Sequence, residues 1–401
     1  MAKKMSMVFV FAVLALLCKV VTAPAEVGVT DDEIVIGTIQ AQTGDMAFIG
    51  NQNVSGTKII IDEVNKKGGI FGRKIKQIVM DDGYVTPRHI ANVRRLITQD
   101  NVFAFLANLG THTVAASLPL LNQYKVPLYG ACSNSALFDN VPYVFSEGAS
   151  YRQMTIQAIH YFIKEKGHKK VAIFYWDNPL GQEHLTAAKE YMKAINQELV
   201  AEEKHKTEDY DLNPQAARLK ASGATAVIIA CSPGGGAKIL KAMHNIGYNP
   251  DAAGPLMLVS PGFLDVAGKD AEGLYLMLPF VSPDDPPLAP WKQAHKAMFP
   301  DKPFDNMVIA NMGHAYVFME ALRRAGKDLT REKLIKAAET IKYDNLDLPH
   351  YKGATDWAYG PDRHRSTSAT IIGRIKDGKL THASKGWLKW GDIPVPEILK
   401  K

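Results

Sequence analysis

The amino-acid sequence predicts an α/β protein built from two doubly wound parallel-sheet lobes. Strand-like apolar runs alternate with segments of helical length and periodicity, which is typical of parallel sheets covered by helices on both faces. This alternation occurs twice, once before and once after residue 150. The 401 residues are 46% hydrophobic and 22% charged. That composition is ordinary for a globular protein, and the length fits two or three domain-sized units.

The individual elements follow from their apolar patterns and end signals. In the first set we expect strands at residues 33–40, 74–82, 102–110 and 126–133. The segment of residues 56–72 is expected to form a helix that stops at Gly68-Gly69. Residues 86–100 are expected to form a second helix, with Thr86 as N-cap and Pro87 in the first position. A third helix is expected to run up to about Tyr124. In the second set we expect helices at residues 151–166, 181–196, 213–222 and 235–246, and strands at residues 170–177, 198–205, 226–232 and 256–261.

The first 25 residues have the pattern of a secretory signal peptide. A basic start is followed by an apolar run from Met7 to Leu17 and by Ala23-Pro24-Ala25, which offers small residues for cleavage. The apolar run is too short to span a bilayer. Lipidation at Cys18 is the alternative, but the preceding Leu17 is bulkier than the residue usual there. We therefore expect a mature protein that begins near Glu26 and is exported to the periplasm.

Charge and cysteine content exclude several classes of function. Without the three lysines of the signal, 44 basic residues face 41 acidic ones, because the whole chain has 47 and 41. This balance argues against nucleic acid or an anionic membrane as partner. The mature chain keeps Cys132 and Cys231, whose spacing predicts neither a disulfide framework nor a zinc site. We expect two free thiols, no metal and no cofactor.

The candidate site lies where the expected strands end, because ligands of parallel sheets bind beyond the carboxyl ends of the strands. The segment "NLGTHTVAAS", residues 108–117, places hydroxyl residues directly after a buried strand. Three interpretations compete for this segment. A phosphate loop is disfavoured because no lysine follows at the required spacing, either here or in "CSPGGGAKIL". Catalysis is disfavoured because neither a G-x-S-x-G nor an H-E-x-x-H pattern occurs.

The third interpretation is a binding site for an anion. Thr111, Thr113 and Ser133 offer hydroxyls, and the starts of the following helices offer free N–H groups. The same hydroxyls could simply cap helices. We favour the ligand-binding role because two such loops occur in the same lobe. His112, between the two threonines, is interpreted as a loop histidine rather than as a catalytic base.

Several longer segments resemble a known family. They read "EIVIGTIQAQTGDMAFIGNQNVSGTKIIIDEVNKKGGIFGRKIKQIVMDD", "VPLYGACSNSAL", "YVFSEGASY", "AEGLYLMLP" and "YGPDRHRS". The order and spacing of these segments carry the resemblance more than any single one does. The sequence is similar to the periplasmic solute-binding proteins of ABC importers, specifically to the branched-chain amino acid (Leu/Ile/Val) binding family with the type I fold.

The resemblance implies a ligand cleft between the lobes and assigns residues to it. In the first lobe, the strand-end loops with Gly110, Thr111 and Ala131-Cys132-Ser133 would hold the ligand's carboxylate, and Phe48 or Ile49 would form an apolar wall. In the second lobe, Leu180 stands where amino-acid binders often carry tyrosine, and Ser232 or Pro233 where another aromatic is common. Trp176 and Tyr175 either face the ligand or pack near the hinge.

One departure from the family bears on the ligand. Ser260 and Pro261 stand where amino-acid binders carry a glutamate that pairs with the ammonium group. A buried ammonium without a carboxylate is costly. Either Asp177 takes that role, or the ligand lacks an ammonium group. The resemblance therefore implies a small carboxylate, which is an apolar amino acid or a related aliphatic or aromatic acid.

The resemblance also implies the domain organisation and the partners. Three strands would cross between the lobes, near residues 145–148, 276–279 and 353–356. The N-terminal lobe would comprise residues 26–146 and 278–354, and the C-terminal lobe residues 147–277 and 355–401. Cys132 and Cys231 would then lie on opposite lobes. The protein would act as a monomer that delivers its solute to a membrane permease with its ATPase subunits.

Two rival functions remain open at this level. An enzyme of the same fold is one, although the sequence offers no credible pair of nucleophile and base. A ligand-sensing receptor is the other. Such a receptor domain usually precedes a membrane-spanning segment, whereas this sequence ends in "VPEILKK".

Overall fold

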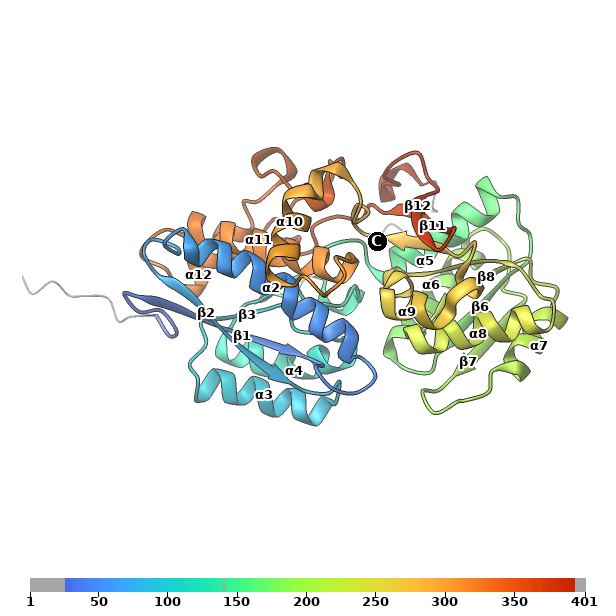
Figure 1. The fold of residues 1–401 in the computed structure, drawn as a ribbon, viewed down its shortest axis with the longest axis horizontal. Coiled ribbons are helices and arrows are strands. Elements are labelled where there is room, and N and C mark those ends of the chain that lie inside the picture. Colours follow the sequence, from blue (N-terminus) through green and yellow to red (C-terminus); the bar gives the residue numbers. More distant parts are fainter. Residues whose placement is uncertain (1–25, 140, 394–401) are drawn as a thin grey trace, which may run out of the picture.

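The computed structural model describes residues 26–139 and 141–393 and shows two lobes side by side (Figure 1). Each lobe has a central, mainly parallel sheet with helices on both faces. The predicted fold class is therefore confirmed. The expected signal peptide, including Cys18 and the cleavage site, lies outside the described residues. Within the described ranges, no helix has the length and hydropathy needed to cross a bilayer.

The first lobe contains a five-stranded parallel sheet in the order β2-β1-β3-β4-β5. Its strands are β1 (Glu33–Gln40), β2 (Lys74–Asp81), β3 (Ala104–Leu106), β4 (Leu128–Tyr129) and β5 (Val144–Phe145). Its helices are α2 (Ala47–Lys66), α3 (Thr86–Thr98), α4 (Thr111–Tyr124), α10 (Ala289–Met298), α11 (Asn306–Ala325) and α12 (Arg331–Ala338). The long helices α2 and α11 pack against each other, so the lobe is completed by residues far along the chain.

The second lobe contains a seven-stranded sheet in the order β12-β11-β10-β9-β8-β6-β7, with β11 and β12 added antiparallel. Its strands are β6 (Val171–Trp176), β7 (Ala201–His205), β8 (Ala226–Ala230), β9 (Asp251–Pro255), β10 (Tyr275–Leu278), β11 (Ile371–Lys376) and β12 (Lys379–His382). Its helices are α5 (Tyr151–His160), continued by a π-helical turn over Tyr161–Glu165, α6 (Pro179–Ala194), α7 (Asn213–Ala221), α8 (Pro233–Asn245) and α9 (Pro261–Ala267).

Four elements differ from the sequence-based prediction. The strands expected at residues 102–110 and 126–133 are shorter, at Ala104–Leu106 and Leu128–Tyr129. Residues 256–259 form a 3₁₀ turn rather than a strand, and the strand is the preceding segment Asp251–Pro255. This segment has weak intrinsic strand propensity, but it is buried between β8 and β10, and tertiary context overrides propensity. Helix α2 begins at Ala47, nine residues before the predicted start, so Phe48 and Ile49 lie in its first turn.

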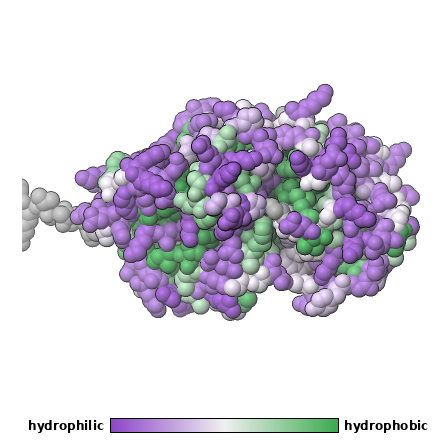
Figure 2. All heavy atoms as spheres, in the orientation of Figure 1, coloured by the Kyte–Doolittle hydropathy of each residue, from purple (hydrophilic) through white to green (hydrophobic). Residues whose placement is uncertain are grey.

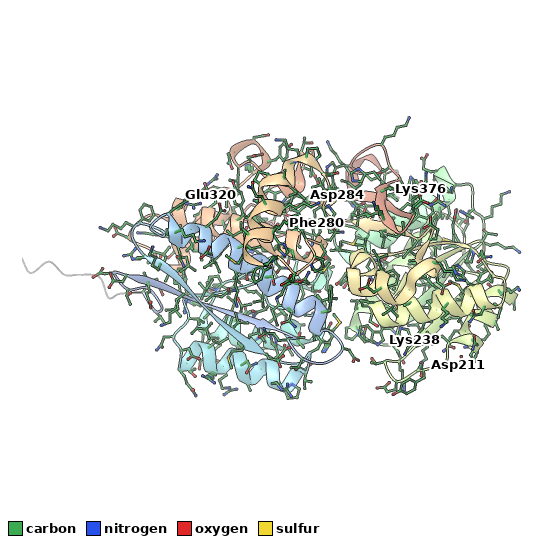
Figure 3. The ribbon with its side chains drawn as sticks, in the orientation of Figure 1. Asp211, Lys238, Phe280, Asp284, Glu320 and Lys376 are labelled. Carbon is green, nitrogen blue, oxygen red and sulfur yellow. The ribbon has the colours of Figure 1, made fainter. Side chains whose placement is uncertain are left out.

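Three segments cross between the lobes, and the third lies later than expected. The first crossing follows β5, and the second follows β10, where Phe280 lies at the boundary between the lobes (Figure 3). Residues 354–363 still belong to the first lobe, because Trp357 and Tyr359 pair with the segment around residues 341–343 and Tyr359 packs edge-on against Phe145. The third crossing follows Arg365, which pairs with Ser146. The N-terminal lobe therefore extends about ten residues beyond the predicted boundary.

The surface of the molecule agrees with a cleft between the lobes. Polar side chains cover most of both lobes on the face shown, and apolar residues appear on the N-terminal lobe and at the boundary between the lobes (Figure 2). Cys132 and Cys231 lie in different lobes as free thiols, as predicted. No disulfide between these two cysteines links the lobes.

In each lobe, one helix begins directly against the end of the preceding strand at a glycine. A methyl group on Gly181 would lie 2.0 Å from the Trp176 carbonyl oxygen, and one on Gly50 would lie 2.0 Å from that of Ala41. We expect Gly181→Ala to lower the free energy of unfolding by about 1–3 kcal/mol through overpacking. Denaturant titration followed by circular dichroism measures this loss.

Gly234→Ala is the matched control, because nothing lies within 4 Å of the added methyl in the first turn of α8. There we expect a gain of about 0.4–1 kcal/mol from reduced entropy of the unfolded chain. Equal effects of the two substitutions would contradict the close approach at Gly181.

Candidate functional site

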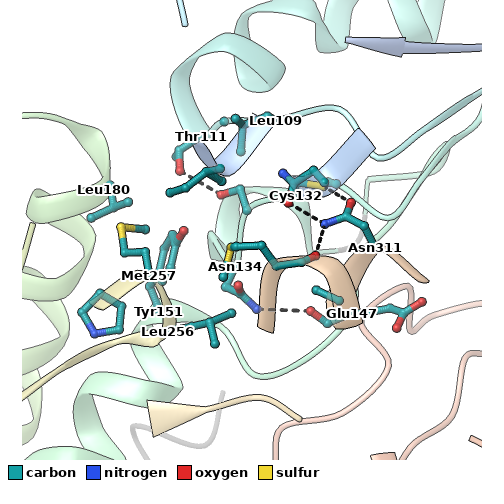
Figure 4. A pocket seen from close by; sticks show the side chains of 18 of the residues that line it. Leu109, Thr111, Cys132, Asn134, Glu147, Tyr151, Leu180, Leu256, Met257 and Asn311 are labelled. Atoms are coloured by element: carbon teal, nitrogen blue, oxygen red, sulfur yellow. Dashed lines mark hydrogen bonds between the residues drawn. The ribbon is translucent and has the colours of Figure 1, made fainter. Parts of the chain in front are cut away.

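A cavity lies between the lobes, beyond the carboxyl ends of several strands (Figure 4). Its free space is about 760 Å³, counting the part open to solvent. Both lobes and two of the crossings contribute to its wall. The lining residues are Met46, Ile49, Asn53, Tyr84, Leu109, Gly110, Thr111, Ala131, Cys132, Ser133, Asn134, Glu147, Tyr151, Met154, Leu180, Pro255, Leu256, Met257, Phe280, Met307, Ala310, Asn311 and His314.

Seven of the predicted site residues lie in this wall. They are Ile49, Gly110, Thr111, Ala131, Cys132, Ser133 and Leu180. Six of them belong to the first lobe, where the sequence placed the carboxylate and the apolar wall. Leu180 comes from the first turn of α6 in the second lobe.

The two first-lobe hydroxyls form a pair. Thr111 Oγ1 and Ser133 Oγ lie 2.8 Å apart in the cavity wall. Helix α4 begins at Thr111 without a side-chain cap. Hydroxyl groups rotate, so an anion at this position can receive a hydrogen bond from each of them. The partial positive charge of the helix start adds to this preference for an anion.

The backbone before this pair requires a glycine. Gly110 has φ of 113°, and a methyl group there would lie 2.2 Å from Thr113 Oγ1 and 2.8 Å from the Tyr84 ring. Thr113 itself donates to the carbonyl of Leu109 and does not line the cavity. The strand-end loop therefore turns sharply enough to present Thr111 to the cavity while Thr113 stabilises the turn.

Two predicted ligand residues of the second lobe instead cap helices. Ser232 accepts from the N–H of Gly235 at the start of α8, and Ser260 accepts from the N–H of Phe263 at the start of α9. Neither residue lines the cavity. Both precede a proline, and a serine followed by proline at the first helical position is a typical helix start. The structure shows a local capping role for both serines.

Three more predicted residues lie outside the cavity wall. Trp176 is buried, and its indole N–H donates to Thr207 Oγ1. The Asp177 carboxylate pairs with Lys204 Nζ at 3.2 Å. Phe48 is partly exposed, and its ring lies next to Gly262 at the start of α9 in the other lobe. It therefore packs at the boundary between the lobes and not in the cavity wall.

A network of polar side chains in the cavity wall was not predicted from the sequence. Asn53 Nδ2 donates to Gln40 Oε1, and Asn311 Nδ2 donates to Asn53 Oδ1 at 2.7 Å. The Cys132 thiol in turn donates to Asn311 Oδ1. These residues come from β1, α2, α11 and the loop after β4. No local pattern could have joined them, because α2 and α11 are more than 250 positions apart.

Glu147 and its neighbour His314 were also missed. Glu147 lies in the first crossing, and its side chain is 1% exposed. Burial raises the pKa of Glu147 to about 7, and His314 opposes this rise. Burial lowers the pKa of His314, so this imidazole is neutral at pH 7. The only available sequence signal was an acidic residue in "VFSEGA", a segment that otherwise reads as buried.

The rest of the wall is largely apolar. Four methionines, Met46, Met154, Met257 and Met307, join leucine, isoleucine and phenylalanine side chains. Methionine is flexible and adapts to the shape of an apolar ligand. The cavity therefore suits a molecule with a substantial apolar body.

The arrangement is poorly suited to catalysis or metal binding. Cys132 Sγ lies 3.9 Å from His314 Nδ1, but burial raises the pKa of the thiol to about 12, so it stays protonated at neutral pH. A protonated thiol is a weak nucleophile. Among the described residues, no cluster of three or more His, Cys, Asp or Glu side chains is placed to hold a metal ion.

Comparison with known proteins identifies the family. Residues 33–379 match the family described as "Periplasmic binding protein". This chain belongs to the periplasmic binding protein family. The resemblance inferred from the sequence is thus confirmed, as is the interpretation as a binding protein rather than an enzyme.

Individual members of the periplasmic binding protein family are distant in sequence. The Leu/Ile/Val-binding protein homolog 7 of Brucella suis is 24% identical over 388 residues, which cover 91% of this chain and 94% of the relative. A branched-chain amino acid ABC transporter from Thermus thermophilus with bound valine superposes with a TM-score of 0.82 at 20% identity, covering 90% of this chain and 97% of the other. A fatty acid ABC transporter substrate-binding protein from Thermomonospora curvata has a TM-score of 0.81 at 22% identity, covering 94% and 96%. These solved structures share the fold with this chain.

Proposed function

We propose that this protein is the substrate-binding protein of an ABC importer, and that it captures a small carboxylate-bearing solute in the inter-lobe cavity. The solute would be an apolar amino acid or a related aliphatic or aromatic carboxylate. The observation that carries this proposal is the Thr111–Ser133 hydroxyl pair at an uncapped helix start inside an apolar cavity. Relatives named for amino acid and fatty acid transport are consistent with it, because both kinds of ligand carry a carboxylate.

Delivery to a permease would follow from closure of the lobes on the solute. The Glu183 carboxylate, in α6, accepts from Ser135 Oγ at 2.6 Å and from the N–H of Ala136 at 2.8 Å, both in the first lobe. These bonds exist only while the lobes are together. A solute that contacts both lobes shifts the population toward the closed form by the free energy of those contacts. The periplasm, reached with a signal peptide cleaved near Ala25, is the compartment that this role requires.

A thermal-shift panel of small carboxylates tests the proposal. At one hundred times its Kd, a ligand stabilises the folded state by about 2.7 kcal/mol, which appears as a rise in Tm. We expect carboxylates with apolar bodies to raise Tm and the corresponding primary amides to have a much smaller effect. A panel in which amides or sugars raise Tm and no carboxylate does would contradict the proposal.

A further inference from the structure

Tyr84 is a cavity residue that the proposed function leaves without a role. It lies in the short loop between β2 and α3, and its side chain lines the cavity from the first lobe. Its backbone has φ of 63°, in the left-handed region that a bulky residue rarely adopts. Strained backbone of this kind persists where the surrounding structure fixes it, and it gathers at ligand-binding sites. The strain thus points to a functional reason for a tyrosine at this position.

A buried pair of side chains fixes the loop that carries Tyr84. Asp82 Oδ1 accepts from the backbone N–H of Tyr84 at 2.8 Å, and Asp82 Oδ2 lies 2.7 Å from His89 Nδ1 of α3. Both side chains of this pair are fully buried. The N–H of Val85 also donates to the Asp82 carbonyl at 3.0 Å. These contacts hold the main chain of Tyr84 in the left-handed conformation, so the fold itself sets the direction of its side chain.

The ring of Tyr84 extends from this loop to the start of α4. A methyl group on Gly110 would lie 2.8 Å from Tyr84 Cε2, the ring carbon next to the one that carries the hydroxyl. Gly110 directly precedes Thr111, whose hydroxyl forms the pair with Ser133. His112 packs edge-on against the ring, with the two centroids 4.7 Å apart. The hydroxyl end of the ring therefore lies at the same end of the cavity as the hydroxyl pair.

The hydroxyl proton of Tyr84 is available to a ligand. No acceptor for it occurs in the described part of the chain. The hydroxyls of Tyr129 and Tyr351 also lack partners there, but the core encloses them completely, whereas Tyr84 is half-buried and lines the cavity. Burial raises the pKa of Tyr84 well above its usual value, so the phenol keeps its proton at neutral pH. Tyr84 thus remains a hydrogen-bond donor under all physiological conditions.

The charge of a carboxylate at this end of the cavity has to be met by neutral donors. Among the described residues that line the cavity, none is a lysine or an arginine, and burial keeps His314 neutral. A carboxylate has two oxygens with about four acceptor positions, which is more than the Thr111–Ser133 pair can occupy. Hydrogen bonds to a charged oxygen are stronger than those between neutral groups. A third hydroxyl beside the pair therefore has an acceptor position to fill.

We propose that Tyr84 is a ligand-binding residue whose hydroxyl donates a hydrogen bond to the carboxylate of the solute, beside Thr111 and Ser133. This inference rests on the proposed function and deepens it, because it adds a third donor to the same anion site. The left-handed conformation of the loop carries the ring from the end of β2 to the start of α4. His112 keeps the ring in that position.

Calorimetry with Tyr84→Phe tests this role, because the substitution removes the hydroxyl and keeps the ring. The probes are the straight-chain carboxylates from butanoate to octanoate, together with benzoate and phenylacetate. For the probe that binds the wild-type protein most tightly, we expect Tyr84→Phe to weaken binding about 10- to 150-fold, the effect of one hydrogen bond to a charged group. The urea midpoint of the ligand-free variant should equal that of the wild type, because the hydroxyl donates to no group of the free protein.

Tyr129→Phe is the matched control. Tyr129 also lies in the first lobe and its hydroxyl also lacks a partner in the described chain, but it does not line the cavity. We expect this variant to bind the same probe within threefold of the wild type. The comparison separates the loss of a donor to the ligand from the loss of a tyrosine hydroxyl as such.

The outcomes distinguish this inference from the proposed function. Binding of a probe to Tyr84→Phe within threefold of the wild type would overturn the role of Tyr84 and leave the proposed function intact. An equal loss of affinity in Tyr129→Phe, or a lower urea midpoint in Tyr84→Phe, would overturn it too, because the hydroxyl would then serve the fold. Failure of every carboxylate to bind the wild-type protein would overturn the proposed function and the role of Tyr84 together.

Discussion

Leucine, isoleucine and valine are expected to bind hundreds- to thousands-fold more weakly than their 2-oxo analogues, which lack the α-ammonium. Breaking a buried ion pair by removing one partner costs about 3–5 kcal/mol. A ligand whose carboxylate contacts Thr111 and Ser133 places its α-ammonium at the same end of the cavity, where no carboxylate lines the wall in the described chain. Ser260, at the expected position of the partner, caps α9 instead.

Side-by-side calorimetric titration of leucine and 4-methyl-2-oxopentanoate measures this difference. Asp177→Asn is the control, because Asp177 is the acidic residue that the sequence offered as an ammonium partner. Its carboxylate forms a partly exposed ion pair with Lys204, and such pairs contribute about 0–1 kcal/mol. We expect this variant to bind both ligands like the wild type.

The contrary outcome is well defined. Leucine binding with sub-micromolar Kd, combined with weak binding of the oxo acid, would show that an ammonium site exists at this end of the cavity. Loss of leucine binding in Asp177→Asn would then identify the partner and require the second lobe to rearrange around the ligand.

Ser133→Ala is expected to weaken binding of the carboxylate ligand by about 1.5–3 kcal/mol, or roughly 10- to 150-fold. Ser133 Oγ accepts from the N–H of Ser135 and lies 2.8 Å from Thr111 Oγ1, where either hydroxyl can be the donor. When Thr111 donates, the Ser133 proton can turn toward an anion. A hydrogen bond to a charged oxygen is stronger than one between neutral groups. Calorimetry with the best carboxylate from the thermal-shift panel measures the loss.

Ser232→Ala controls for the loss of a serine hydroxyl as such. Ser232 caps α8 outside the cavity wall, so its substitution should lower the free energy of unfolding by about 1 kcal/mol and leave the ligand affinity unchanged. If Ser133→Ala binds the carboxylate like the wild type, the anion is held elsewhere and the assignment of the hydroxyl pair is wrong.

The two-lobed α/β architecture could be predicted from the amino-acid sequence alone, because alternating strand and helix patterns are local properties of the chain. The sequence also located the first-lobe half of the cavity. The carboxyl ends of parallel strands meet at one edge of a sheet, so the loops with Thr111 and Ser133 had to be neighbours. Their pairing at 2.8 Å agrees with that expectation.

Which hydroxyls and carboxylates line the cavity depends on contacts between residues far apart in the sequence. Ser133 and Ser232 both follow buried strands in the sequence, yet one faces the cavity and the other caps a helix. Asp177 and Glu147 are both single acidic residues at strand ends. One reaches Lys204 on the surface, and the other is enclosed by His314, Tyr351 and Tyr359. The enclosing residues lie more than 150 positions away from Glu147 in the chain, and no local pattern records such contacts. Burial of a charge is a property of the folded whole, so only the fold could single out Glu147 as the carboxylate of the cavity.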